Sequence, residues 1–411
     1  MKTAMREKLW AEKYPEVGTG PVPTEPMFSE EHFALERDRI FRRTWINVGR
    51  VEDIPEPGDY FVRDISVCGV SLLIIRGADG IVRGFHNVCS HRGKKLVLDE
   101  RGSCRDSVVC PFHSWVYSNT GELRHVPDEE NFFDLDKRTL GLTPVHADTW
   151  EGFVFCHLDS EPGETLRQYL GGLADQLDGC QFSRMRLTST HNVDVHANWK
   201  VVQDGQNEAY HFPFQHRRVL AGSFMRNEKG HCRYQDVNLY NYHSVWSCEY
   251  PPSQKLTPLR TALAADAFRT TSFHPPQMIG KMDHFVVFPN FVILLVQIGR
   301  TACYVTYNLW PLAVDRTIWE VRMHFTEPES VRERLRQEYF KCITLDTLRE
   351  DMVAHESVFA GLATGAKSHV ILQDDEMPLR FFHKTVEDHV GFYRDGCAAV
   401  PQSDGAGNDH G

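Results

Sequence analysis

Two short stretches of this 411-residue chain each pair a cysteine with a histidine. Cys89 and His91 are separated by one residue, and Cys110 and His113 are separated by two. The chain has 11 cysteines, and an odd number spread over this length is not the disulfide framework of a small secreted domain. We therefore expect reduced thiols, which bind metal ions as thiolates.

Three interpretations of these four residues compete. A structural zinc site groups its two cysteines together and its two histidines together, whereas each stretch here supplies one of each. A chance arrangement of four ligand-type residues in two matched motifs is improbable. In a Rieske [2Fe–2S] centre, two thiolates bind one iron and two imidazoles bind the other. The spacing resembles that pattern, so Cys89, His91, Cys110 and His113 are the predicted cluster ligands, and Cys104, without a partner at ligand spacing, is not.

A second set of ligand-type residues lies in the stretch NEAYHFPFQH. His211 and His216 are five residues apart, and Glu208 precedes the first by three. Because Pro213 cannot continue a helix, we expect a helical stretch over 200–211 to end or kink between the two histidines. Their rings can then converge on one metal. Two imidazoles and one carboxylate are the ligands of non-haem iron(II) sites that use O2.

The carboxylate for such a site must come from another part of the chain. The best candidate is Asp351 in TLREDMVAHE, inside a long helical pattern at residues 330–362. The adjacent Glu350 is rotated by more than a quarter-turn on a helix, so we expect it to point away. The alternative for Asp351 is a solvated helix face, which composition alone favours.

The elements that must position these residues follow from hydrophobic patterning. Residues 29–43 are expected to form a helix that Ser29 caps. Strand-like runs separated by turns fill residues 45–160 and predict a small all-β unit that carries both Cys-His pairs on loops. After a linker at 161–164, helical segments and strands alternate as far as the helix predicted at 330–362.

The composition excludes some classes of function. Lys+Arg 45 against Asp+Glu 56 gives a net charge of −11, whereas a nucleic-acid-binding protein needs a basic face. The most apolar segment, residues 285–299, is broken by Pro289 and is too short to cross a bilayer, so it predicts buried strands. The opening residues contain no secretory signal. We therefore expect a cytoplasmic protein that binds neither nucleic acid nor membrane.

Over nearly its full length the chain resembles the α subunits of Rieske non-haem iron oxygenases, also called ring-hydroxylating oxygenases. The two Cys-His pairs, the NWK…E-x-Y-H-x4-H block, the FPN sequence at 288–290 and the late Glu-Asp helix occur in the order typical of that family. The resemblance implies that His211, His216 and Asp351 bind a mononuclear Fe(II). It also implies that Glu208 bridges to a cluster histidine of a neighbouring subunit.

The resemblance further implies an α+β fold with two domains. A small all-β Rieske [2Fe–2S] domain is expected at residues 45–160. A larger α+β catalytic domain, with a central antiparallel sheet flanked by helices in a helix-grip or START-like arrangement, is expected at 161–397. The helical segment at 1–44 would belong to the catalytic domain, and the composition of residues 398–411 predicts a disordered tail.

Two departures from the family pattern bear on function. The bridging position, usually Asp in the family, is Glu208 here, and Glu occurs there in some members that act on quaternary ammonium compounds. Where the family often has an acidic residue followed by Asn, this chain has Asp204 and Gly205. Asp204 is therefore a second candidate for the bridging carboxylate.

The function implied by the resemblance is that of a terminal oxygenase. It would use O2 and electrons from an NAD(P)H-dependent reductase, with or without a ferredoxin. The expected assembly is a homotrimer, or a hexamer of three such α subunits and three small β subunits. Neither the number of oxygen atoms inserted nor the position of attack follows from the sequence.

The expected substrate is hydrophobic, and aromatic or polycyclic. Its pocket should be lined by residues 218–300, which contain the aromatic side chains Phe224, Tyr234, Tyr240, Tyr242, Trp246 and Phe273. An alternative is a monooxygenase or demethylase for a quaternary ammonium compound, held by aromatic rings through cation–π contacts. A Rieske electron carrier without oxygenase activity would not need the roughly 250 residues that follow Leu158.

Overall fold

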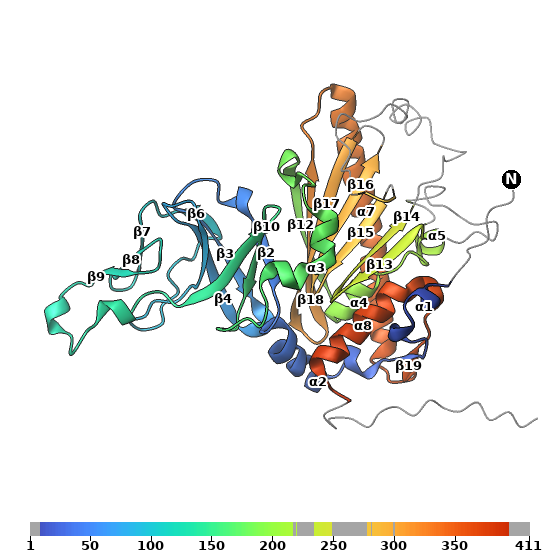
Figure 1. Ribbon diagram of the computed structural model, residues 1–411, viewed down its shortest axis with the longest axis horizontal. Helices are drawn as coiled ribbons and strands as arrows, with labels where there is room; N and C mark the ends of the chain where they lie inside the picture. Colours follow the sequence, from blue (N-terminus) through green and yellow to red (C-terminus); the bar gives the residue numbers. More distant parts are fainter. Residues whose placement is uncertain are drawn as a thin grey trace, which may run out of the picture.

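The computed structural model describes residues 9–216, 219, 234–248, 278–280, 282–298 and 301–393. The chain forms two bodies that lie side by side, one all-β and one built on a sheet flanked by helices (Figure 1). This is the predicted α+β architecture with antiparallel sheets. Among the described residues, no helix is both long enough and apolar enough to span a membrane.

The all-β body contains a seven-stranded sheet and a three-stranded sheet. The larger sheet has the order β2 (Ile46–Arg50), β11 (Phe153–His157), β10 (Pro144–Trp150), β5 (Val82–His86), β4 (Val70–Arg76), β3 (Asp59–Ile65) and β6 (Arg101–Ser103). The smaller sheet consists of β7 (Ser107–Val109), β8 (Val116–Ser118) and β9 (Leu123–His125). One Cys-His pair follows β5, and the other lies between β7 and β8.

The second body is built on one antiparallel sheet of seven strands. Its order is β12 (Arg186–Val195), β18 (Arg316–Phe325), β17 (Thr301–Ala313), β16 (Phe291–Ile298), β15 (Met282–Val287), β14 (His243–Cys248) and β13 (Asp236–Tyr240). The helices around it are α3 (Leu166–Leu177), α4 (Trp199–Asp204), α5 (Phe212–Gln215), α7 (Val331–Leu362) and α8 (Met377–Val390). The apolar segment at 285–299 thus supplies buried strands, as predicted.

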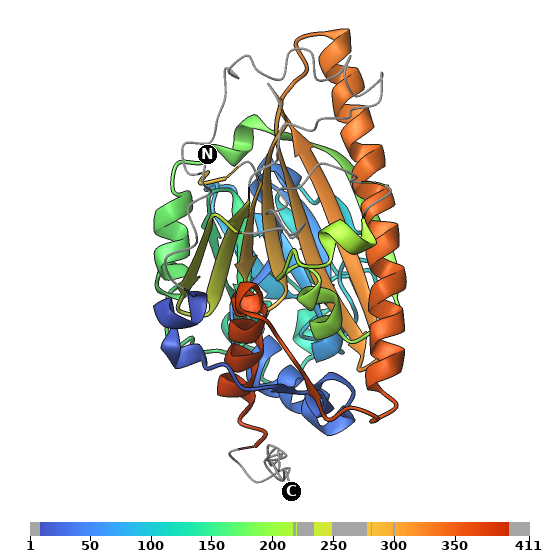
Figure 2. The ribbon, with the colours of Figure 1, turned by 90° about the vertical axis from the view of Figure 1, so that its right-hand side faces the viewer.

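Successive side chains of β16 point to opposite faces of the sheet, so the core of this body has two layers, one on each face. Ile293 and Leu295 pack with α3 on one face of the sheet, whereas Val292 and Leu294 face the side on which α7 supplies Leu348. Figure 2 shows α7 running along the sheet on that side. The helix predicted at 330–362 is therefore present as α7, and Ser330 caps it by accepting the Glu333 N–H.

The N-terminal segment packs against the second body. It contains α1 (Trp10–Lys13), β1 (Val22–Pro23) and α2 (Glu30–Glu36), and β1 pairs with β19 (His369–Val370). Ser29 caps α2 as expected. The α-helix is shorter than the predicted 29–43, because residues 37–41 form a wider π-helical turn. Buried Glu36 accepts the Trp199 indole N–H at 2.7 Å and thereby joins α2 to α4.

A buried ion network joins the two bodies. Glu320 on β18 lies 2.8 Å from Arg63 on β3 and 2.7 Å from Arg322, and Arg322 lies 3.0 Å from Asp53. Burial alone would raise the pKa of the Glu320 carboxyl, but Arg63 and Arg322 outweigh it and lower that pKa to about 2. The orientation of the all-β body is thus held by charges that are largely withdrawn from water.

Candidate metal centres and catalytic pocket

The two Cys-His stretches fold into loops with the same backbone pattern. The Cys89 N–H donates to the Lys94 carbonyl at 2.9 Å, and the Cys110 N–H donates to the Trp115 carbonyl at 2.8 Å. The fifth residue of each loop, Gly93 or Ser114, has a positive φ, of 72° and 57° respectively. Each loop therefore turns its cysteine inward.

The loops bring the four predicted cluster ligands together. The two cysteines are buried, and burial together with the nearby Cys110 side chain raises the pKa of the Cys89 thiol. The rings of His91 and His113 lie 4.6 Å apart at an interplanar angle of 66°. Two thiols on the inner side and two imidazoles on the outer side are the donor set of a Rieske [2Fe–2S] cluster, so these residues fit the group.

Neighbouring side chains support this donor set. The Trp115 ring stacks on His91 at 4.8 Å. The Tyr117 hydroxyl lies 3.1 Å from the Cys89 sulfur and accepts the Ser90 N–H. Sequence reasoning missed Tyr117, because only the pairing of β7 with β8 brings it beneath the loop. Cys104 lies 3.4 Å from the Gly58 carbonyl and takes no part in the donor set.

The predicted iron-binding histidines stand at the two ends of the one-turn helix α5, His211 before it and His216 after it. The expectation of a helix over 200–211 that ends at Pro213 was wrong. Helix α4 stops at Asp204, and Pro213 lies in the first turn of α5, where a missing N–H costs nothing. A single turn places both rings on the same side.

Three side chains converge at this point. Nε2 of His216 lies 2.9 Å from an Asp351 carboxylate oxygen, Nε2 of His211 lies 3.6 Å from that oxygen, and the two nitrogens are 3.1 Å apart. Their ligand atoms lie within 4.8 Å of one another. Two imidazoles and one carboxylate at this spacing fit a mononuclear iron with further coordination positions open.

The outer ring nitrogens of both histidines also have carboxylate partners. Glu208 contacts Nδ1 of His211, and Glu350 lies 2.8 Å from Nδ1 of His216. The expectation that Glu350 points away was wrong. Because His216 is inserted beside α7, consecutive carboxylates of one helix reach opposite nitrogens of the same ring. Such partners fix which nitrogen faces the metal.

The two candidate bridging carboxylates occupy different surroundings. Glu208 accepts the backbone N–H groups of Tyr210 and His211 in addition to contacting the His211 ring. Asp204 instead lies 2.8 Å from Nε2 of His383 on α8. The geometry favours Glu208 over Asp204 for orienting an iron-binding ring, and a bridge from either residue to another subunit stays a prediction.

A cavity adjoins the three converging side chains. It is lined by Gly205, Gln206, Phe212, Met282, His284, Leu294, Val296, Tyr307, Phe340, Ile343, Thr344, Thr347, Leu348 and Asp351. Most of these side chains are apolar or aromatic. Tyr307 on β17 and Phe340 on α7 were not predicted as pocket residues, because both lie outside the predicted range of 218–300.

The aromatic residues predicted to line the pocket have different positions. The Trp246 ring stacks on that of the pocket residue His284, with centroids 4.2 Å apart, and on that of Tyr234, with centroids 5.0 Å apart. Tyr240 and Tyr242 lie toward α3, where Tyr240 bonds to Gln176 and Tyr242 packs against Tyr169. These two tyrosines therefore belong to the opposite core layer. Phe224 and Phe273 lie outside the described residues.

Comparisons with known proteins agree with this arrangement. Residues 44–145 match the model of the Rieske [2Fe-2S] domain, and residues 182–391 match that of the ring hydroxylating alpha subunit (catalytic domain). The carnitine monooxygenase oxygenase subunit of Escherichia coli is 31% identical over 46% of this chain. The glycine betaine monooxygenase oxygenase subunit of Pseudomonas aeruginosa is 30% identical over 48%. The chain spans about half the length of these curated relatives, 50% and 45%.

Solved structures share the fold over a greater length. Naphthalene 1,2-dioxygenase from Rhodococcus sp. bound to indole superposes with a TM-score of 0.74 at 24% identity, covering 90% of this chain and 94% of that one. The quaternary ammonium Rieske monooxygenase CntA in complex with gamma-butyrobetaine gives a TM-score of 0.72 at 20% identity, covering 93% and 99%.

The chain belongs to the ring hydroxylating alpha subunit family. It combines the two domains of a Rieske non-haem iron oxygenase α subunit, with donor sets that fit a Rieske [2Fe–2S] cluster and a mononuclear iron. The cofactors expected from the sequence are thereby confirmed. The individual ligand assignments rest on the geometry described above.

Proposed function

We propose that this oxygenase is a monooxygenase for a quaternary ammonium compound. The observation that carries the proposal is the cavity beside Asp351, where the rings of Phe212, Tyr307 and Phe340 contribute to the lining and no Lys or Arg is found among the lining residues that the structure describes. Aromatic faces without a competing cation attract a trimethylammonium group. Carnitine, glycine betaine and choline monooxygenases among the relatives give independent support.

A second candidate is hydroxylation of an aromatic compound, the substrate class expected from the sequence. The apolar side chains of Leu294, Val296 and Leu348 in the same cavity favour it. The two candidates differ in what the cavity must do. An aromatic hydrocarbon needs only apolar contact, whereas a quaternary ammonium ion also needs the electrostatic attraction of ring faces.

When bound, the cluster and the iron supply the redox chemistry by which O2 is reduced and one of its atoms enters a C–H bond. Around them, Glu208 and Glu350 hold the two histidine rings, and the cavity orients the substrate next to Asp351. Attack at an N-methyl or an adjacent carbon would give a hydroxylated product that loses an amine or an aldehyde.

Electron supply requires partners. We propose an NAD(P)H-dependent reductase as donor, with or without a ferredoxin, and a homotrimer or a hexamer with small β subunits as the assembly. Within one chain, β7 and β8 lie at one end of the molecule and α5 at the other (Figure 1). A neighbouring copy that places its cluster domain beside α5 would shorten the electron path, and Glu208 stands at that position.

Competition between substrate classes tests the proposal. Oxygen uptake with purified iron-replete protein, a surrogate reductase and NADH would be measured for quaternary amines and for two-ring aromatic compounds. We expect turnover of an amine and its inhibition by tetramethylammonium, with weaker inhibition by the isosteric, uncharged neopentane. Turnover of the aromatic panel alone, unaffected by tetramethylammonium, would assign the second function.

A further inference from the structure

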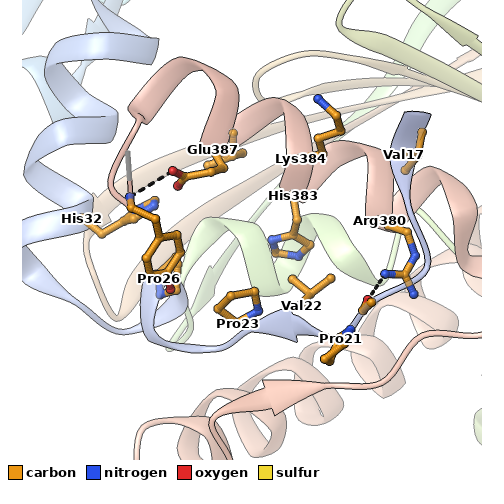
Figure 3. Close-up of a pocket in the computed structure, with 13 residues that line it drawn as sticks. Val17, Pro21, Val22, Pro23, Pro26, His32, Arg380, His383, Lys384 and Glu387 are labelled. Atoms are coloured by element: carbon orange, nitrogen blue, oxygen red, sulfur yellow. Dashed lines mark hydrogen bonds between the residues drawn. The ribbon is translucent and has the colours of Figure 1, made fainter. Parts of the chain in front are cut away.

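A separate cavity of about 250 Å³ lies between the N-terminal segment and α8. Its walls include Val22 and Pro23 on one side and Arg380, His383 and Lys384 on the other. Figure 3 shows the His383 ring projecting from α8 into the space between Pro23 and Arg380. The cavity described beside Asp351 has different lining residues, so it is distinct from this one.

One hydrogen-bonded pair lies between the two cavities. Nε2 of His383 is 2.8 Å from a carboxylate oxygen of Asp204, the last residue of α4. The next residue, Gly205, lines the catalytic cavity together with Asp351. His383 is 8% exposed, and its side chain lines the outer cavity. The pair thus links a residue of the outer cavity to Asp204, the chain neighbour of Gly205 in the catalytic cavity.

The reaction of this class of enzyme creates a demand that such a pair can meet. Insertion of one oxygen atom of O2 into a C–H bond consumes two electrons and two protons, and the second oxygen atom leaves as water. The site that needs these protons is partly withdrawn from water, because the His216 side chain is fully buried and those of Asp351 and His211 are 8% and 21% exposed. Groups that exchange protons can therefore assist their delivery through the surrounding protein.

We propose that His383 and Asp204 carry protons from the outer cavity to the catalytic cavity. Water in the outer cavity protonates the free nitrogen of the His383 ring. The proton on the other nitrogen passes to Asp204 and then to water beside Gly205, and rotation of the ring restores its starting tautomer. Imidazole and carboxylate side chains transfer protons at neutral pH when they are in hydrogen-bond contact.

Titratable groups on three elements lie near Asp204. Lys200 lies on the same helix, His355 on α7 and Glu376 in the turn of residues 374–376 that precedes α8. Burial, followed by the nearby Glu208 and Asp204 carboxylates, raises the pKa of Glu376 to about 7.

The groups that face His383 have mixed charge. His32 on α2 is close, and burial lowers its pKa and keeps it neutral. Arg380 donates to the Gly20 and Leu372 carbonyls, and Lys384 pairs with Asp388, so neither cation is directed at the His383 ring. Glu387 lines the same wall and accepts the Tyr393 N–H.

Alternatively, the hydrogen bond between His383 and Asp204 has a structural role and holds α8 against α4. His383→Gln separates the two roles, because the amide can keep the hydrogen bond to Asp204 but cannot pass a proton. We expect product formation to fall by at least about tenfold, with unchanged melting temperature, cluster absorbance and iron content. Normal turnover by His383→Gln would overturn the proposal and assign the hydrogen bond a structural role alone.

Chemical rescue supplies the decisive measurement. His383→Ala enlarges the outer cavity beside Asp204, and we expect added imidazole to restore turnover relative to wild type at the same imidazole concentration. His389→Ala is the control, because His389 lies on the same helix but packs against Phe288 away from the cavity lining. Failure of imidazole to rescue His383→Ala, or equal rescue of both variants, would overturn the proposal.

The substrate in these assays is whichever class the wild-type enzyme converts, so the outcome does not depend on the proposed substrate. A solvent isotope effect on turnover completes the test. It should be larger for imidazole-rescued His383→Ala than for wild type, because proton delivery then limits the rate. An unchanged isotope effect would indicate that imidazole acts by restoring structure and would contradict the relay.

Discussion

Glu350 lies 2.8 Å from Nδ1 of His216, while the next residue of the same helix, Asp351, lies 2.9 Å from Nε2 of the same ring. Two consecutive carboxylates therefore hold one imidazole from opposite sides. The inner one belongs to the candidate iron site, and the outer one fixes the ring's orientation and raises the basicity of the nitrogen that faces the metal.

Glu350→Gln should weaken iron binding. Because the outer carboxylate orients His216 and increases its basicity, we expect mononuclear iron affinity to fall by about 10–100-fold, with the cluster unaffected. Competition with an iron chelator, followed by metal analysis, measures the change. Glu356→Gln is the matched control, since Glu356 lies on the same helix and accepts the His196 N–H. Equal iron loss from both variants would contradict the assigned role.

Glu208→Gln should separate metal content from activity. The amide can still accept the backbone N–H groups, so both metals should remain, but the negative charge beside His211 is lost. We expect coupled product formation to disappear. Glu208→Asp restores the charge on a shorter side chain and should recover part of the activity. Normal turnover by Glu208→Gln would show that the bridge assignment is incorrect.

Tyr117→Phe should lower the reduction potential of the cluster. The hydroxyl lies 3.1 Å from the Cys89 sulfur, and a donor to a cluster thiolate stabilises the reduced state with its additional negative charge. Redox titration followed by absorbance measures the potential. Cys104→Ser, at the cysteine outside the donor set, should leave the potential unchanged. A potential that shifts equally in both variants would exclude a specific role of this hydrogen bond.

The Glu320 network predicts a defined dependence of stability on pH. The pKa of Glu320 is depressed in the folded protein to about 2 from the ordinary value of 4.5. A depressed carboxyl pKa contributes stability above the unfolded-state value, and that contribution is lost as the pH falls from about 4.5 toward 2. Glu320→Gln should therefore be less stable than wild type at pH 7 by roughly 3 kcal/mol.

Denaturant unfolding at several pH values checks this expectation. The stability difference between wild type and Glu320→Gln should shrink as the pH falls through that window. The control is Arg316, which lies on the same strand as Glu320 and forms a solvent-exposed ion pair with Asp194. Arg316→Gln should change stability by less than about 1 kcal/mol. A difference for Glu320→Gln that does not vary with pH would mean that packing, and not charge, sets its effect.

The sequence predicted those parts of the site that depend on short-range spacing. The Cys-His loops and the His211–His216 pair are local motifs, and the helix that carries Asp351 is marked by its length. Glu350 and Tyr117 were not predicted, because their roles depend on how α7 meets His216 and how β8 lies beneath the Cys89 loop. Pro213 was misinterpreted, since a proline permits a helix start as readily as it ends one.

The central claim is that this chain inserts oxygen from O2 into a quaternary ammonium substrate. Product mass after turnover under ¹⁸O2, with purified iron-replete protein, a surrogate reductase and NADH, tests it most directly. One labelled oxygen atom in the product of an amine, or in the aldehyde released from it, is the predicted result. Two labelled atoms in an aromatic product, with no conversion of any amine, would contradict the account.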